Sequence, residues 1–195
     1  MHYILIRELR KSIRGFVKNG EVVIKAPYFV PQRVIDNFFA KHRDYFAAKL
    51  YPTYIYYLGK AYKIASIEEG YRLVDEHFLS DRYLEDNLAL FYKTQAKEYL
   101  PGRVEMLASK FGDRYAKVHI TAAKTRWGSC SSKGNINLSY RLMMLPPGTI
   151  DYVIIHELCH LHHFNHSKAF WKLVQQRCKD YKQHENELKK FAKFL

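Results

Sequence analysis

Three histidines and one glutamate near the C-terminal end of the sequence have the spacing of a catalytic metal site. His156 and His160 lie four residues apart in His-Glu-Leu-Cys-His, with Glu157 directly after His156. On an α-helix, residues four apart are about 40° apart around the axis and about 6 Å apart along it, so both imidazoles can bind one metal ion. Glu157 lies about 100° around the helix, where its carboxylate can hold and deprotonate a metal-bound water. The pattern therefore predicts a zinc-dependent hydrolase.

A third ligand is needed, and three histidines follow the motif. His162 points about 200° away from His160, which takes it off the metal face. His163 shares that face but lies about 7.5 Å along the axis beyond the midpoint between His156 and His160, too far for a metal–nitrogen bond of about 2.1 Å. His166 stands ten residues after His156, so a helix that ends near residue 163 lets the chain return its imidazole to the metal. We expect zinc on His156, His160 and His166.

The elements that position these residues must share a buried core. With 195 residues, 48% of them hydrophobic, and only 9 Gly and 6 Pro, the chain suits one domain, or a domain with a small lobe. No apolar run reaches the roughly 18 residues of a membrane span, and the apolar run at the N-terminus is too short for a signal peptide. The 3 cysteines have no repeated spacing, which favours free thiols. We expect a cytoplasmic protein without membrane contact.

Residues 1–80 are expected to form a β-rich N-terminal lobe that carries one helix. Residues 12–18 and 21–26 are β-favouring runs around Asn19-Gly20, a strong hairpin signal. Apolar residues at helical spacing from Pro31 to Leu50 predict a single amphipathic helix. Aromatic and β-branched segments at 54–58, 61–67 and 71–74 predict a meander of short strands.

Residues 81–195 are expected to form the catalytic domain. The pattern predicts a helix over 81–111 that Pro101 kinks or splits, and strands over 118–121 and 135–144 with a turn-prone connection between them. Pro146-Pro147-Gly148 should end the second strand, and Thr149 or Asp151 should cap the metal-binding helix. Further helices are expected after Ser167 and after Gln183.

Several segments together resemble a known family. They are Arg126-Trp127-Gly128-Ser129-Cys130, Ile136-Asn137-Leu138, Asp151-Tyr152-Val153 before the His-Glu-x-x-His helix, and Asn165-His166 with Phe170-Trp171. They are similar to the YgjP-like metallopeptidases of the zincin superfamily, and the resemblance covers most of the chain. It implies an α+β fold with a zincin-like metallopeptidase domain, and one zinc ion on the three histidines with Glu157 as general base. Mn or Co can occupy such a three-histidine site as well.

The same resemblance suggests where a substrate would bind. In zincins the strand before the active helix forms the upper edge of the cleft, which places residues 135–142 there, and an extended peptide could pair with that edge. Asn137 in this strand and Arg126 in the preceding loop are the candidate substrate-binding residues. Arg126 could bind an anion or stabilise an oxyanion, or it could stack on Trp127, which is expected in the core.

Three functions stay open at this point. The first is a metallopeptidase, in which the activated water attacks a peptide carbonyl. The net charge of +13 and Arg126 also fit a nucleotide pyrophosphohydrolase that uses the same metal site on nucleoside triphosphates. The third is a DNA-associated protease similar to SprT-like proteins, bound to nucleic acid through its basic surface. Basic residues gathered around the metal would favour the nucleotide substrate.

Overall fold

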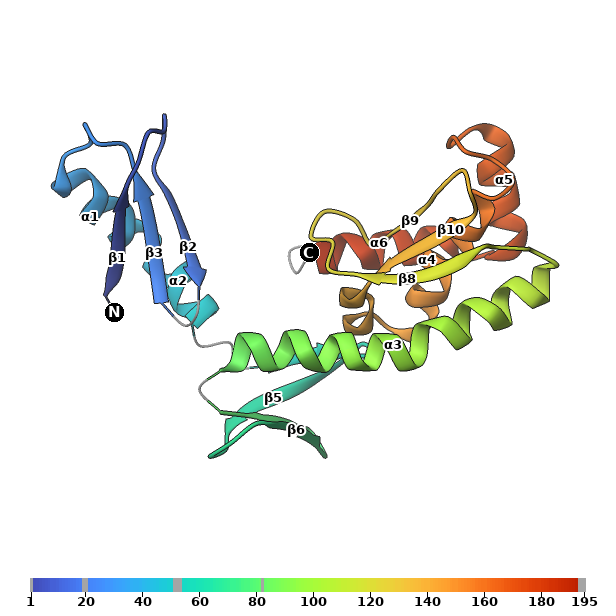
Figure 1. Ribbon diagram of the computed structural model, residues 1–195, viewed down its shortest axis with the longest axis horizontal. Helices are drawn as coiled ribbons and strands as arrows, with labels where there is room; N and C mark the ends of the chain where they lie inside the picture. The colour runs from blue at the N-terminus through green and yellow to red at the C-terminus, as the bar shows by residue number, and fades with distance from the viewer. Residues whose placement is uncertain (1, 19–20, 51–53, 82, 193–195) are drawn as a thin grey trace. The chain divides into compact units, whose positions relative to one another are not determined.

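The computed structural model describes residues 2–18, 21–50, 54–81 and 83–192 (Figure 1). The chain divides into two compact units. The N-terminal unit comprises residues 1–55 and 62–87, and the C-terminal unit comprises residues 56–61 and 88–195. Helices and three sheets occur together. The expected α+β class with a β-rich N-terminal region is therefore confirmed.

A three-stranded sheet begins the N-terminal unit. Strands β1 (Tyr3–Arg7), β2 (Arg14–Lys18) and β3 (Glu21–Ala26) have the order β1-β3-β2, with β1 parallel and β2 antiparallel to β3. Figure 1 shows β3 between its two partners. The antiparallel pair is the expected hairpin, while its predicted turn at Asn19-Gly20 lies outside the described residues.

The single helix expected after Pro31 is two helices, which corrects the prediction. Helix α1 (Gln32–Lys41) ends at His42, whose φ of −107° and ψ of 17° leave the helical region. The His42 Nδ1 lies 2.8 Å from the Phe38 carbonyl oxygen, and α2 (Arg43–Leu50) begins at the next residue. Ile35 of α1 and Phe46 of α2 both lie in a core with Val22, Ile24 and Ala26 of the β-sheet.

The second sheet is not the meander that the sequence pattern predicts. It contains β4 (Tyr54–Tyr57), β5 (Lys60–Ser66), β6 (Tyr71–Val74) and β7 (His77–Ser80), in the order β4-β5-β7-β6. Strand β7, which the prediction missed, pairs parallel with β5 and antiparallel with β6. Asp75 takes a positive φ of 50° in the β6–β7 turn. This tight turn places β7 between β5 and β6, so chain order and spatial order differ.

Helix α3 (Leu84–Phe111) leads into the C-terminal unit without the split expected at Pro101. A proline removes the hydrogen bond to the carbonyl four residues earlier. That carbonyl belongs to Lys97, an exposed position where water can bond to it. The missing bond therefore costs less than it would inside the core. Within the described residues, no helix is both long enough and apolar enough to span a bilayer.

The sheet of the C-terminal unit contains β8 (Lys117–Thr121), β9 (Gly128–Cys130) and β10 (Asn135–Ser139). Its order is β8-β10-β9, with β10 parallel to β8 and antiparallel to β9. The strand expected over 135–144 ends at Ser139, whose Oγ accepts the Arg141 N–H at 3.3 Å and starts the 3-10 helix η1 (Tyr140–Met144). A hydroxyl that caps a turn explains this early end.

Three further helices complete the C-terminal unit: α4 (Pro147–Cys159), α5 (Lys168–Arg177) and α6 (Tyr181–Phe191). Pro147 is the first residue of α4, so Pro146-Pro147 starts the helix, and neither Thr149 nor Asp151 caps it as expected. A proline suits this position because its missing N–H needs no partner there. The cap expected at Ser167 is present, while α6 begins at Tyr181, before the expected Gln183.

Candidate metal centre and active site

Helix α4 is a buried helix that fixes two of the candidate ligands. Most of its residues are buried, including Ile150, Ile154 and Leu158, which are fully covered. A helix that is apolar on nearly all sides lies inside a core and has little freedom to move. His156 and His160 are therefore carried by a rigid element.

The end of α4 departs from the prediction that the helix continues to about residue 163. The helix ends at Cys159, and the following backbone bonds tighten to the three-residue spacing of a 3-10 turn, as in His160 N–H to Glu157 O at 3.2 Å. This turn brings the His163 carbonyl 2.9 Å from His160 Nδ1. A carbonyl only accepts, so Nδ1 carries the proton and the Nε2 lone pair of His160 stays available to a metal.

His166 returns to the other two histidines just before α5 begins. The Ser167 hydroxyl accepts the Phe170 N–H at 3.4 Å and caps the helix. The Nε2 atoms of His166 and His156 lie 3.1 Å apart, and one nitrogen from each of the three histidines lies within 4.8 Å of the others. Ligands about 2.1 Å from a tetrahedral zinc ion are about 3.4 Å from one another, so the cluster has the dimensions of a zinc site.

Aromatic rings surround this histidine cluster, defined as His156, His160 and His166. The Phe170 ring stacks on His160 with centroids 4.5 Å apart, and Trp171 stacks on His166 at 5.7 Å. Such a wall holds the imidazoles in place and keeps water away from one side of them.

Burial keeps His156 and His160 in the form that binds metals. Desolvation, with smaller contributions from His160 and His166, lowers the pKa of His156 to about 4. Desolvation also lowers the pKa of His160. Both rings are neutral at pH 7, which is the state that a metal ligand requires. The donor set and its protonation therefore fit a divalent cation.

Glu157 is a buried carboxylate beside the histidine cluster. Desolvation raises its pKa to about 8, and the positive charge of Arg126 opposes this shift. Among the described residues, its Oε2 is one of few buried side-chain polar atoms without a partner, together with His156 Nδ1. An acid with a pKa near neutrality can both accept and return a proton.

Gly128 touches this carboxylate, a contact that the sequence analysis missed. A Cβ placed on Gly128 would lie 2.7 Å from Glu157 Oε1 and 2.8 Å from its Cγ. A larger residue would have to displace the carboxylate, so glycine is needed at this position. The residue stands within the motif Arg126 to Cys130, but the spacing of that motif does not reveal what Gly128 contacts.

Two hollows lie beside strand β9, and one of them is also lined by Glu157. One, of about 250 Å³, is lined by Arg126, Trp127, Gly128, Tyr152, Val153, His156, Glu157 and Leu188. The other, of about 230 Å³, is lined by Thr121, Ala123, Arg126, Gly128, Ser129 and Asn137. Trp127 is half-buried and lines the first hollow, so its expected place in the core is wrong. It belongs to a loop that leaves one side of the indole open.

The two candidate substrate-binding residues occupy different places. Arg126 is exposed and lines both hollows, whereas Asn137 lines only the second and donates to the Ser129 Oγ at 3.3 Å. Arg126 is the single Lys or Arg in either described lining. A triphosphate needs several cations around it, so this lining gives the nucleotide alternative less support.

Strand β10 is not the edge strand that was expected. Strand β10 pairs on both sides, so its backbone is occupied, and the outer strands of this sheet are β8 and β9. Trp127 O accepts from Ser139 N at 2.8 Å, and Ser131 N donates to Asn135 O at 3.0 Å. Since backbone groups alternate in direction along an antiparallel strand, those of Gly128 and Cys130 point away from β10. The open edge therefore lies beside Glu157.

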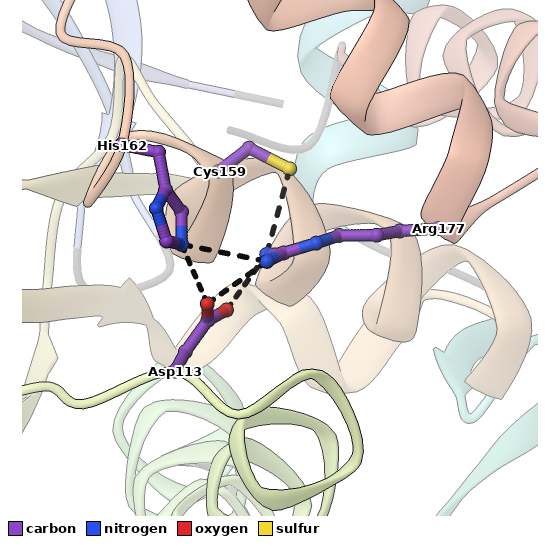
Figure 2. Close-up of polar contacts among 4 residues, drawn as sticks. All are labelled: Asp113, Cys159, His162 and Arg177. Atoms are coloured by element: carbon purple, nitrogen blue, oxygen red, sulfur yellow. Dashed lines mark hydrogen bonds and ion pairs between the residues drawn. The ribbon is translucent and has the colours of Figure 1, made fainter.

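A buried ion pair holds the turn between His160 and His166, two of the candidate ligands. The Arg177 guanidinium donates to both oxygens of Asp113, at 2.7 and 2.8 Å, and His162 Nε2 lies 2.6 Å from Asp113 Oδ1 (Figure 2). The Asp113 side chain is only 1% exposed. His162, which lies between His160 and His166 in the sequence, is therefore held by its contact with Asp113 instead of being a free surface residue. Asp113 and Arg177 lie 64 residues apart, and no sequence pattern points to their pairing.

Comparisons with known proteins agree with the chemistry of the site. No curated protein matches the chain. One solved structure, the metallopeptidase zymogen of Pyrococcus abyssi abylysin, is 30% identical over 42% of this chain and 86% of that chain, with a TM-score of 0.37. A profile of the YgjP-like metallopeptidase domain matches residues 11–191, nearly the whole chain. The chain therefore belongs to the YgjP-like metallopeptidase family.

Proposed function

We propose that this protein is a zinc-dependent peptidase whose metal ligands are His156, His160 and His166 and whose general base is Glu157. The observation that carries the proposal is the position of Glu157 beside three imidazoles that converge on one point. The carboxylate of Glu157 is buried, and its pKa is raised to about 8. Three-histidine sites with an adjacent glutamate are typical of hydrolytic zinc chemistry.

In peptide hydrolysis the metal and Glu157 have separate roles. A bound zinc ion supplies a Lewis acid that lowers the pKa of water and polarises a carbonyl. Glu157 accepts the proton of the attacking water at its unpartnered Oε2 and returns it to the leaving amine. The raised pKa of Glu157 allows it to hold that proton between the two steps.

The open edge of β9 supports a peptide as the substrate. The outward backbone groups of Gly128 and Cys130 can pair with an extended chain, which places its carbonyl beside Glu157. Arg126 lines both hollows and can bind an acidic side chain or a developing negative charge. Trp127 offers an apolar surface to a substrate side chain.

The test compares zinc-loaded wild type with Glu157→Gln on a mixed peptide library and, in parallel, on nucleoside triphosphates. We expect peptide cleavage to fall by about 100- to 10,000-fold in Glu157→Gln, while the zinc content stays the same. Glu98→Gln, at an exposed position of α3, is the matched control and should cleave at the wild-type rate. A Glu157→Gln enzyme as fast as wild type would refute the general-base role. Phosphate release in place of peptide cleavage would refute the substrate class.

A further inference from the structure

A second cluster of metal-binding side chains lies where α5 passes into α6. Cys178 follows the last residue of α5, Asp180 precedes the first residue of α6, and His184 lies in the first turns of α6. One ligand atom from each of the three lies within 4.8 Å of the others. We call these three residues the junction cluster.

Asp180 stands at a capping position but does not cap. Its side chain makes no hydrogen bond to the first turn of α6, although an aspartate there commonly does. One of its oxygens accepts from Cys178 Sγ at 3.3 Å, and the other lies 3.3 Å from His184 Nε2. The carboxylate thus lies between a thiol and an imidazole instead of stabilising the helix end.

His184 is supported in the way that metal-binding histidines usually are. Its Nδ1 lies 3.1 Å from the hydroxyl of the buried Thr149, and its ring stacks on Tyr152 at a centroid distance of 5.9 Å. A Cβ on Gly148 would lie 3.1 Å from His184 Cε1, so the glycine leaves room for the ring. With Nδ1 engaged, Nε2 faces the other two side chains of the cluster, which is the arrangement of a metal-ligating imidazole.

The charges of the junction cluster also favour a cation. The Asp180 carboxylate carries a negative charge beside the Cys178 sulfur. A metal ion bound there would displace the thiol proton, because a coordinating thiol is deprotonated by the metal. The Asp180 side chain is 56% exposed, which gives an ion access from solvent and room for a water as fourth ligand.

We propose that Cys178, Asp180 and His184 bind a second divalent cation, of the zinc class. The sulfur, oxygen and nitrogen donors suit zinc or cobalt better than magnesium or calcium, which prefer oxygen alone. The bound ion joins α5 to α6. Through His184 it also fixes Tyr152, whose ring contacts His156 edge-on at 6.1 Å and lines the catalytic hollow.

Cobalt(II) distinguishes the two clusters because only one of them contains a thiol. The full chain is stripped with a chelator and titrated with Co²⁺, and the thiolate-to-cobalt charge-transfer band is followed beside the bound metal per chain. We expect about two equivalents of cobalt and the band in wild type. Cys178→Ser should lose the band and one equivalent. Serine keeps a hydroxyl that donates to Asp180, so a junction held only by hydrogen bonds would survive this change.

Matched variants make each outcome decisive. Cys130→Ser and Cys159→Ser remove the other cysteines of the chain and should keep the band. His166→Ala should keep the band and lose the equivalent that belongs to the histidine cluster, so failure of the proposed catalytic metal is seen separately. Saturation at one equivalent without a band would overturn the proposal. Loss of the band in Cys130→Ser or Cys159→Ser, but not in Cys178→Ser, would overturn it as well.

Discussion

The histidine cluster and the junction cluster both lie in the C-terminal unit, yet they are built differently. The first has three imidazoles, with Phe170 and Trp171 stacked on them and a buried carboxylate alongside. The second has three different donors, and its carboxylate is exposed. A cation at the first cluster would meet a hollow and a base, whereas one at the second would meet solvent. The difference separates a site arranged for chemistry from one arranged to join two helices.

The largest expected effect concerns the aspartates that hold the two regions together: Asp113 near the histidine cluster and Asp180 in the junction cluster. Asp113→Ala leaves the Arg177 guanidinium buried without its partner, and we expect a loss of about 3–5 kcal/mol in the free energy of unfolding. Asp180→Ala breaks an exposed pair and should cost less than about 1 kcal/mol in metal-free protein. Urea unfolding of the metal-free variants measures both. Equal losses would show that the two clusters are supported alike.

A smaller effect is expected from the contact between Gly128 and the base. Gly128→Ala places a methyl group 2.7 Å from Glu157 Oε1, and a displacement of about 1 Å can lower turnover by about 100-fold. The turnover number for peptide cleavage should fall while zinc content and the cobalt band of the junction cluster are retained.

Gly102→Ala is the control for this change, since nothing lies within 4 Å of its Cβ position. In the interior of α3, alanine should stabilise the helix by up to about 1 kcal/mol and leave turnover unchanged. Full activity in Gly128→Ala would contradict the close contact.

The last comparison concerns pH, whose effect on stability has opposite signs at the two carboxylates. Glu157 has an ordinary pKa of 4.5 that burial raises to about 8. Between these values the folded state holds a proton that the unfolded state releases, so metal-free protein loses stability as pH rises through this window. For Asp180 the pKa is lowered, first through the Cys178 hydrogen bond. Its contribution is present above its ordinary pKa and is lost as pH falls.

Urea unfolding of metal-free wild type and Glu157→Gln at a series of pH values tests this expectation. The amide mimics the protonated acid at every pH, so the difference between the two proteins should grow by roughly 4 kcal/mol from pH 4.5 to pH 8. A difference that does not change with pH would show that the pKa of Glu157 is not raised.

Short-range pattern was enough to find most of the elements and the histidine cluster. Hydrophobic spacing located α4, and the positions of His156, His160 and His166 follow from helix geometry and one short return of the chain. The same reasoning failed to predict which strands pair with each other. It missed β7, because pairing between strands depends on partners that local spacing does not specify. The edge position of β10, which the family resemblance implied, was wrong as well.

The sequence by itself determined that His156 and His160 can bind one metal ion with Glu157 alongside, because a helix fixes residues four apart without help from the rest of the chain. Tertiary structure alone decided that Gly128 touches Glu157, that Asp113 pairs with Arg177, and that β9 rather than β10 is an edge strand beside Glu157. Each of these contacts joins segments far apart in the chain. Only the packing of the whole unit, which buries those segments together, brings them within reach.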